Sequence, residues 1–257
     1  MANIYNRFRQ ELGYTNVTNQ YIELASRKLR AQYGYELQAN LEHIAKGEGL
    51  SISVLCQDFG LRIAQGYIIS VYTCLDRFLV DYKNLPGSPT YHGKDGENSS
   101  LLEWTWDIVG KRATQDEKNA FYLCDYYRLV RNSIVHKGVP SSQLRQRYST
   151  VEKLCSSKLD APNCISHLTF DDQVLFSRAA FCLSKFIFTK GEYDITNAVD
   201  SLKAELYPQI RTCLGENDRE IAKKKIKKAL EAYYPPFENA DWDAVLYAVA
   251  TVRGTKG

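Results

Sequence analysis

An arginine, an asparagine and a histidine lie within six residues of one another in the segment RNSIVH, as Arg131, Asn132 and His136. An arginine stays positively charged and can hold phosphate oxygens through two parallel hydrogen bonds. An imidazole titrates near pH ~6.5, so it can take up or release a proton at neutral pH. A phosphate-binding cation beside a proton carrier is suited to chemistry at phosphorus.

The helix that must carry this segment is predicted over residues 116–137, with Gly138 and Pro140 ending it. A helical projection predicts a core-facing stripe made by Leu123, Tyr127, Val130 and Ile134. The opposite side holds the polar residues Asp125, Arg128, Asn132 and His136, with Arg131 on the flank. We therefore expect the motif to point away from the core. An ordinary solvated polar face is the alternative interpretation.

The segment RNSIVH resembles the Arg-x(4–6)-His signature of the HEPN superfamily, in which Asn often follows the arginine, as Asn132 does here. A glycine soon after the histidine, here Gly138, is also familiar in that family. The resemblance covers residues 51–140 and extends toward 190. It implies a helical bundle that dimerises and brings two such motifs into one cleft. Many members are metal-independent endoribonucleases, often toxins or antiviral-defence effectors, whereas others only bind or dimerise.

This resemblance implies an RNA substrate, no cofactor and no metal, with Arg131 binding the phosphate and His136 acting as general acid or base. Asn132 would orient the histidine or the phosphate. The implied partners are a second copy of the chain and a regulatory, antitoxin-like companion protein. One alternative is a non-catalytic HEPN-like dimerisation or nucleotide-binding module controlled by a partner protein. Another is a helical scaffold in which the short motif is accidental.

Other polar residues are weaker candidates for the same site. Asp76 lies on the flank of the strongest predicted helix, over 60–84. It either contacts Arg131 or pairs with its neighbour Arg77 or with water. Arg128 is a second supporting candidate. His92 lies in a Gly- and Pro-rich loop over 85–100, and His43 and His167 have no partner that the sequence indicates. The lysines of KKKIKK (223–228) form either a solvated helix face or a surface for an RNA backbone.

The surrounding periodicity is helical almost throughout, which predicts an all-α bundle. Further helices are expected over 101–112, 142–157, 170–189, 197–213, 217–233 and 241–252. Residues 3–46 are expected to form broken helical pieces interrupted by Gly13, Gly34 and Gly47. We predict an N-terminal extension over 1–50, a HEPN-like core over 51–190 and a C-terminal helical region over 191–257.

The composition fits a globular chain with its own core. Of 257 residues, 44% are hydrophobic and 25% are charged, and the formal net charge is only +3. This balance argues against a large non-specific DNA-binding surface. The seven cysteines form no CxxC pair, which favours a reducing compartment and predicts a cytoplasmic protein. No apolar run approaches the ~20 residues of a membrane span, so no membrane partner is expected.

Overall fold

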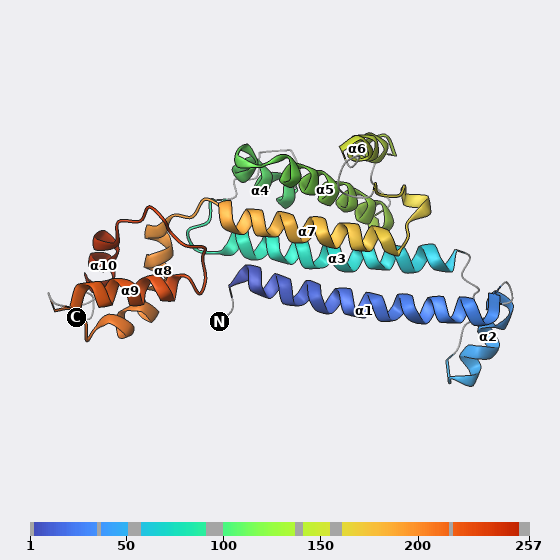
Figure 1. The fold of residues 1–257 in the computed structure, drawn as a ribbon, viewed down its shortest axis with the longest axis horizontal. Helices are drawn as coiled ribbons and strands as arrows, with labels where there is room; N and C mark the ends of the chain where they lie inside the picture. The colour runs from blue at the N-terminus through green and yellow to red at the C-terminus, as the bar shows by residue number, and fades with distance from the viewer. Residues whose placement is uncertain are drawn as a thin grey trace. The chain divides into compact units, whose positions relative to one another are not determined.

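The structure, a computed structural model, describes residues 3–34, 37–50, 58–90, 100–136, 141–154, 161–215 and 218–251. Every regular element in these ranges is helical, which confirms the predicted all-α bundle (Figure 1). The α-helices are α1 (Ile4–Tyr33), α2 (Leu37–Gly47), α3 (Phe59–Asn84), α4 (Leu101–Val109), α5 (Gln115–His136), α6 (Ser141–Leu154), α7 (Phe170–Lys190), α8 (Ile195–Ile210), α9 (Arg219–Leu230) and α10 (Trp242–Ala250). Within the described ranges, no helix combines the length and the apolar character that crossing a bilayer requires.

The expected break at Gly13 is wrong, because α1 runs through it without interruption. A β-carbon built at Gly13 would have no heavy atom within 4 Å. A glycine inside a helix costs only about 1 kcal/mol relative to alanine, which a helix of 30 residues tolerates. Gly34, by contrast, follows the end of α1 with a positive φ of 55°, a backbone conformation that glycine adopts readily.

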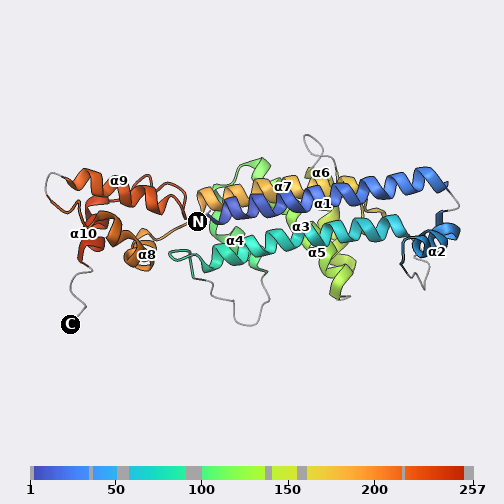
Figure 2. The ribbon, with the colours of Figure 1, turned by 90° about the horizontal axis from the view of Figure 1, so that it is seen from below.

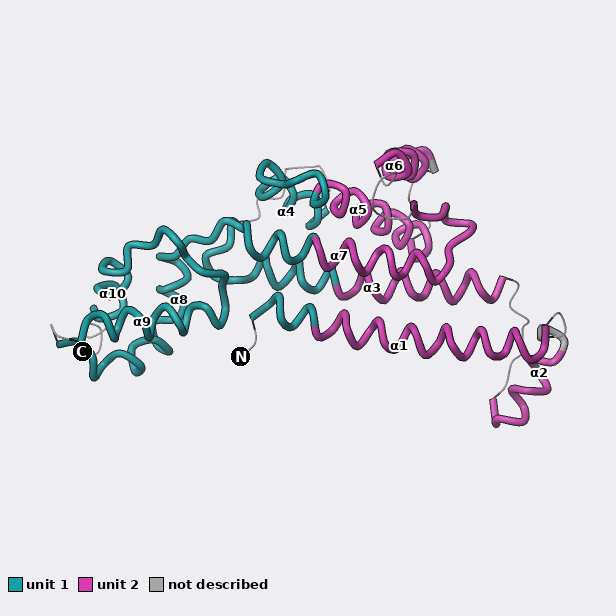
Figure 3. The backbone as a smooth tube through the Cα atoms, in the orientation of Figure 1, with its two compact units in different colours: residues 1–9, 75–117, 183–257 teal, residues 10–74, 118–182 magenta. Residues whose placement is uncertain are grey.

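The chain divides into two compact units (Figure 3). Unit 1 contains residues 1–9, 75–117 and 183–257, and unit 2 contains residues 10–74 and 118–182. The domain boundaries expected near residues 50 and 190 stay predictions. The motif over 131–136 lies in unit 2.

Unit 2 is built from parts of α1, α3, α5 and α7, together with α2 and α6 (Figure 3). Its core is apolar and aromatic, and its fully buried side chains include Ile68, Val71, Leu123, Val130 and Ala180. The Tyr127 ring stacks on Phe176 with ring centroids 4.7 Å apart. The Tyr127 hydroxyl is also satisfied, since it donates to Asp172 Oδ1 at 2.9 Å. A buried tyrosine thus ties α5 to α7 by packing and by a hydrogen bond.

Within unit 2, α1 has an unusual polarity. Its buried face changes from apolar at Leu12 to polar at Asn19 and Ser26. Asn19 Nδ2 donates to Ser70 Oγ on α3 at 3.1 Å, and Asn16 Oδ1 accepts from Gln173 and Ser177 on α7. Large apolar side chains line its exposed side instead, at Tyr14, Val17, Tyr21 and Leu24.

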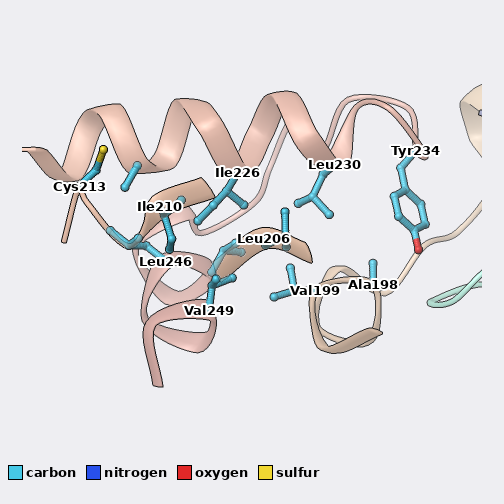
Figure 4. Close-up of a cluster of buried hydrophobic side chains, with 12 residues drawn as sticks. Ala198, Val199, Leu206, Ile210, Cys213, Ile226, Leu230, Tyr234, Leu246 and Val249 are labelled. Carbon is cyan, nitrogen blue, oxygen red and sulfur yellow. The ribbon is translucent and has the colours of Figure 1, made fainter. Parts of the chain in front are cut away.

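The C-terminal helices of unit 1 share a core of their own. Figure 2 shows α8, α9 and α10 gathered together, and Figure 4 shows their buried side chains. Val199, Leu206, Ile226, Leu230 and Val249 are each at most 2% exposed. Two hydrogen bonds join this group of helices to the turn after α3. Tyr234 Oη donates to the Pro86 carbonyl at 2.7 Å, and the Asp194 amide donates to the Gly87 carbonyl at 2.7 Å.

Candidate functional site

The motif is carried by a helix that is buried on nearly all sides. The buried residues of α5 are Ala120, Phe121, Leu123, Cys124, Asp125, Tyr126, Tyr127, Leu129 and Val130. These positions cover more than the predicted core stripe, and a helix that is buried all round belongs to the interior of a bundle. The end of α5 is different, since Arg131, Asn132, Ser133 and Ile134 are half-buried and His136 is exposed. The motif therefore emerges at the surface from a firmly held helix.

The expectation that Asp125 and Arg128 point away from the core is wrong. The Asp125 side chain is 0% exposed and that of Arg128 only 11%. The reason is that α6 covers this face. Arg147 of α6 contacts Asp125, with Arg147 Nε 2.7 Å from Asp125 Oδ2. Arg128 approaches the other carboxylate oxygen through Nη2 at 2.6 Å and Nε at 2.8 Å.

This arrangement is a carboxylate held between two guanidinium groups. A buried charge is tolerated in a protein only when it is paired and hydrogen-bonded. Arg128 on α5 supplies a hydrogen bond to Oδ1, and Arg147 on α6 supplies a second positive charge beside Oδ2. Two nitrogens of Arg128 face Asp125 on the same helix, so this pair stabilises the carboxylate that Arg147 contacts from α6. The support of the motif by Arg128 stays a prediction.

Arg131, Asn132 and His136 are brought together by the last turns of α5. Arg131 Nη1 donates to Asn132 Oδ1 at 3.0 Å and lies 2.8 Å from His136 Nε2. A guanidinium only donates hydrogen bonds, so Nε2 is the acceptor in this contact. Nε2 of the imidazole is thus directed at the guanidinium of Arg131.

Tyr72, which the sequence did not single out, completes the cluster. The guanidinium carbon of Arg131 lies 5.5 Å from the centroid of the Tyr72 ring. A cation over an aromatic face at this distance is stabilised by about 0.5–1 kcal/mol at an exposed position. Tyr72 belongs to α3 and is half-buried. It supports the guanidinium from a helix that is distant in sequence, and only the packing of α3 on α5 reveals it.

None of the contacts that the structure describes adds another of the predicted residues to this cluster. Asp76 is half-buried on α3 and belongs to unit 1, whereas Arg131 belongs to unit 2. Its predicted contact with Arg131 stays a prediction. His92 and Gly138 lie outside the described residues.

The lysine-rich segment over 223–228 lies on α9. Ile226 faces the C-terminal core, while Lys224, Lys225, Lys227 and Lys228 are exposed. Lys223 pairs with Glu220 and with Asp243, at 2.8 Å in each case. Both the solvated-face interpretation and the RNA-backbone interpretation are compatible with this arrangement.

Comparisons with known proteins do not place the chain in a family. No family model matches it, and no match is found among curated proteins or solved structures. The resemblance to the HEPN superfamily thus rests on the motif and its position near the end of a helix. The class defined by the fold is an all-α bundle with an Arg–Asn–His cluster at the end of one largely buried helix.

Proposed function

We propose that this chain is a metal-independent endoribonuclease of the HEPN type, acting as a toxin or an antiviral-defence effector. The observation that carries the proposal is the 2.8 Å contact between Arg131 Nη1 and His136 Nε2. It joins a permanent cation to an imidazole at the accessible end of a largely buried helix. RNA cleavage needs both groups, because the 2′-hydroxyl of the substrate supplies the nucleophile.

In the proposed reaction, His136 Nε2 accepts the proton of the 2′-hydroxyl. The 2′-oxygen forms a bond to the adjacent phosphorus, and the bond from phosphorus to the 5′-oxygen breaks. A second proton carrier, the equivalent histidine of another copy of the chain, protonates the leaving 5′-oxygen. Arg131 stabilises the negative charge that grows on the phosphate oxygens.

The arrangement of Arg131 suits this role. Among the described residues, both of its hydrogen bonds leave from Nη1, toward Asn132 and His136. The edge formed by Nε and Nη2 can bind a phosphate through two parallel hydrogen bonds. When the phosphate draws the guanidinium away from His136, the Nε2 lone pair becomes available to the 2′-hydroxyl. Substrate binding would thus switch the histidine from its resting contact to its function as a base.

The proposal is tested with the purified full chain and total RNA, with and without EDTA. We expect cleavage to persist in EDTA and to leave a 2′,3′-cyclic phosphate, or its opened product, on one fragment and a 5′-hydroxyl on the other. A 2′-O-methylated RNA and an all-DNA strand of the same sequence serve as controls and should stay intact. Cleavage of the DNA strand at a comparable rate would refute the mechanism. Binding of RNA without cleavage would favour a non-catalytic module controlled by a companion protein.

We also predict a homodimer. One histidine cannot serve as base and acid in the same step, and the half-buried Arg131 and exposed His136 leave the motif accessible to a second copy. Light scattering at micromolar concentration should give twice the chain mass of 29.4 kDa. A strict monomer in a preparation that cleaves RNA would contradict this prediction.

A further inference from the structure

A cysteine and a histidine meet in unit 2 on the short 3-10 turn between α6 and α7 (Ile165–His167). Cys164 Sγ lies 3.0 Å from His167 Nδ1 and 3.2 Å from Ser166 Oγ. Ser166 Oγ is itself 3.2 Å from His167 Nδ1. The thiol and two polar groups, Ser166 Oγ and His167 Nδ1, thus form a closed triangle. The sequence indicated no partner for His167.

The backbone that presents this thiol is anchored on both sides. The Asn163 carbonyl accepts from Tyr126 Oη at 2.6 Å, and the Asn163 amide donates to Asp172 Oδ1 at 2.8 Å. The Thr169 amide donates to the other oxygen of Asp172 at 2.8 Å. Asp172 is only 1% exposed, so a buried carboxylate fixes the segment at both ends. The thiol is held in place against its two partners.

Cys164 also differs from the other cysteines that the structure describes. Cys74, Cys124 and Cys213 are buried, and Cys182 is half-buried on α7. Hydrogen bonds from Ser166 and His167 lower the pKa of the Cys164 thiol from its usual value, whereas burial raises the pKa of the Cys124 thiol. Hydrogen bonds from Thr212 and Lys225 also lower the pKa of the Cys213 thiol, but that side chain is buried. The thiolate is the nucleophilic form of cysteine. Cys164 therefore combines partial exposure with groups that stabilise its reactive form.

We propose that Cys164 is a covalent modification site that forms a mixed disulfide with a small-molecule disulfide, and that Ser166 and His167 hold its thiolate. The Cys164 thiolate attacks one sulfur of the incoming disulfide, a new S–S bond forms, and the original S–S bond breaks. Cys164 is oxidised, half of the incoming disulfide is reduced, and its thiol leaves with the proton given up by Cys164. The exposed His167 side chain can carry that proton. This site is independent of the proposed nuclease.

The test treats the folded full chain with a limiting amount of the aromatic disulfide dithiobisnitrobenzoate. The rate of adduct formation is then followed for each cysteine-containing peptide by mass spectrometry. We expect Cys164 to react about tenfold faster than Cys182, the matched half-buried cysteine, because thiolate character and access set the rate. With oxidised glutathione, the stable mixed disulfide should form first on the peptide that contains Cys164. Equal or slower reaction at Cys164 than at Cys182 would overturn the proposal.

Two variants separate the role of the cluster from simple exposure. His167→Ala should slow adduct formation at Cys164 by about tenfold and leave the rate at Cys182 unchanged. Ser166→Ala should slow it by a smaller factor, about threefold. Both side chains are exposed, and helix content by circular dichroism confirms that the variants fold. An unchanged rate at Cys164 in His167→Ala would refute the role of the histidine and with it the proposed site.

Discussion

His136→Ala is expected to lower the rate of RNA cleavage by about a hundredfold or more, because a positioned general acid or base contributes at least that much. The side chain is exposed, so the variant should keep its fold and its thermal unfolding midpoint. Arg131→Lys should reduce cleavage by about tenfold to a hundredfold. An ammonium group keeps the charge but cannot make the two parallel hydrogen bonds of a guanidinium.

Matched variants elsewhere in the chain make this result specific. His43 is an exposed histidine on α2, and Arg62 is an exposed arginine on α3. His43→Ala and Arg62→Lys should cleave RNA at the wild-type rate. The measurement is the initial rate of product formation on one defined single-stranded RNA. Wild-type activity in His136→Ala would remove the histidine from the mechanism.

Asp125→Ala is expected to lower the free energy of unfolding by about 3–5 kcal/mol, the cost of breaking a buried ion pair by removing one partner. The substitution leaves the guanidinium of Arg128, which is 11% exposed, without its carboxylate. It also releases Arg147 of α6 from α5, since Arg147 Nε contacts Asp125 Oδ2 at 2.7 Å. Urea denaturation followed by circular dichroism measures the change.

The control is an ion pair of similar length at the surface. Arg112 Nη2 and Glu192 Oε1 are 2.8 Å apart, with side chains 55% and 54% exposed. Glu192→Ala should cost less than about 1 kcal/mol, because water and salt screen an exposed pair. A loss below about 1 kcal/mol for Asp125→Ala as well would show that the buried carboxylate does not fasten α6 to α5.

Helical periodicity was enough to predict most of the fold. The helix expected over 60–84 is Phe59–Asn84, and the helix expected over 116–137 is Gln115–His136. Strong apolar stripes and turn residues set these bounds. The same rules failed in α1, where Gly13 was expected to interrupt a helix that continues. An isolated glycine inside a helical pattern lowers helix stability by only about 1 kcal/mol relative to alanine, so it does not by itself end a helix.

The site was only partly predictable from the sequence. Spacing on one helix brought Arg131, Asn132 and His136 within hydrogen-bond reach, and the structure has these contacts. Tyr72 and Arg147 could not be found in that way, because α3 and α6 bring them to α5 from other parts of the chain. The projection also placed Asp125 on the outer side, since it contains no information on which helix covers a polar face.

The polar inner face of α1 has a consequence for how unit 2 opens. Asn16 and Asn19 attach this helix to α7 and α3 through side-chain hydrogen bonds, and water can replace such bonds once the helix separates. Exposing apolar surface to water is unfavourable, because water makes no hydrogen bonds to it that could offset the lost packing. The later turns of α1 should therefore exchange their amide hydrogens through local opening, well below the free energy at which the aromatic core around Tyr127 unfolds. Stability in this unit is then graded, with the later turns of α1 less protected than the aromatic core.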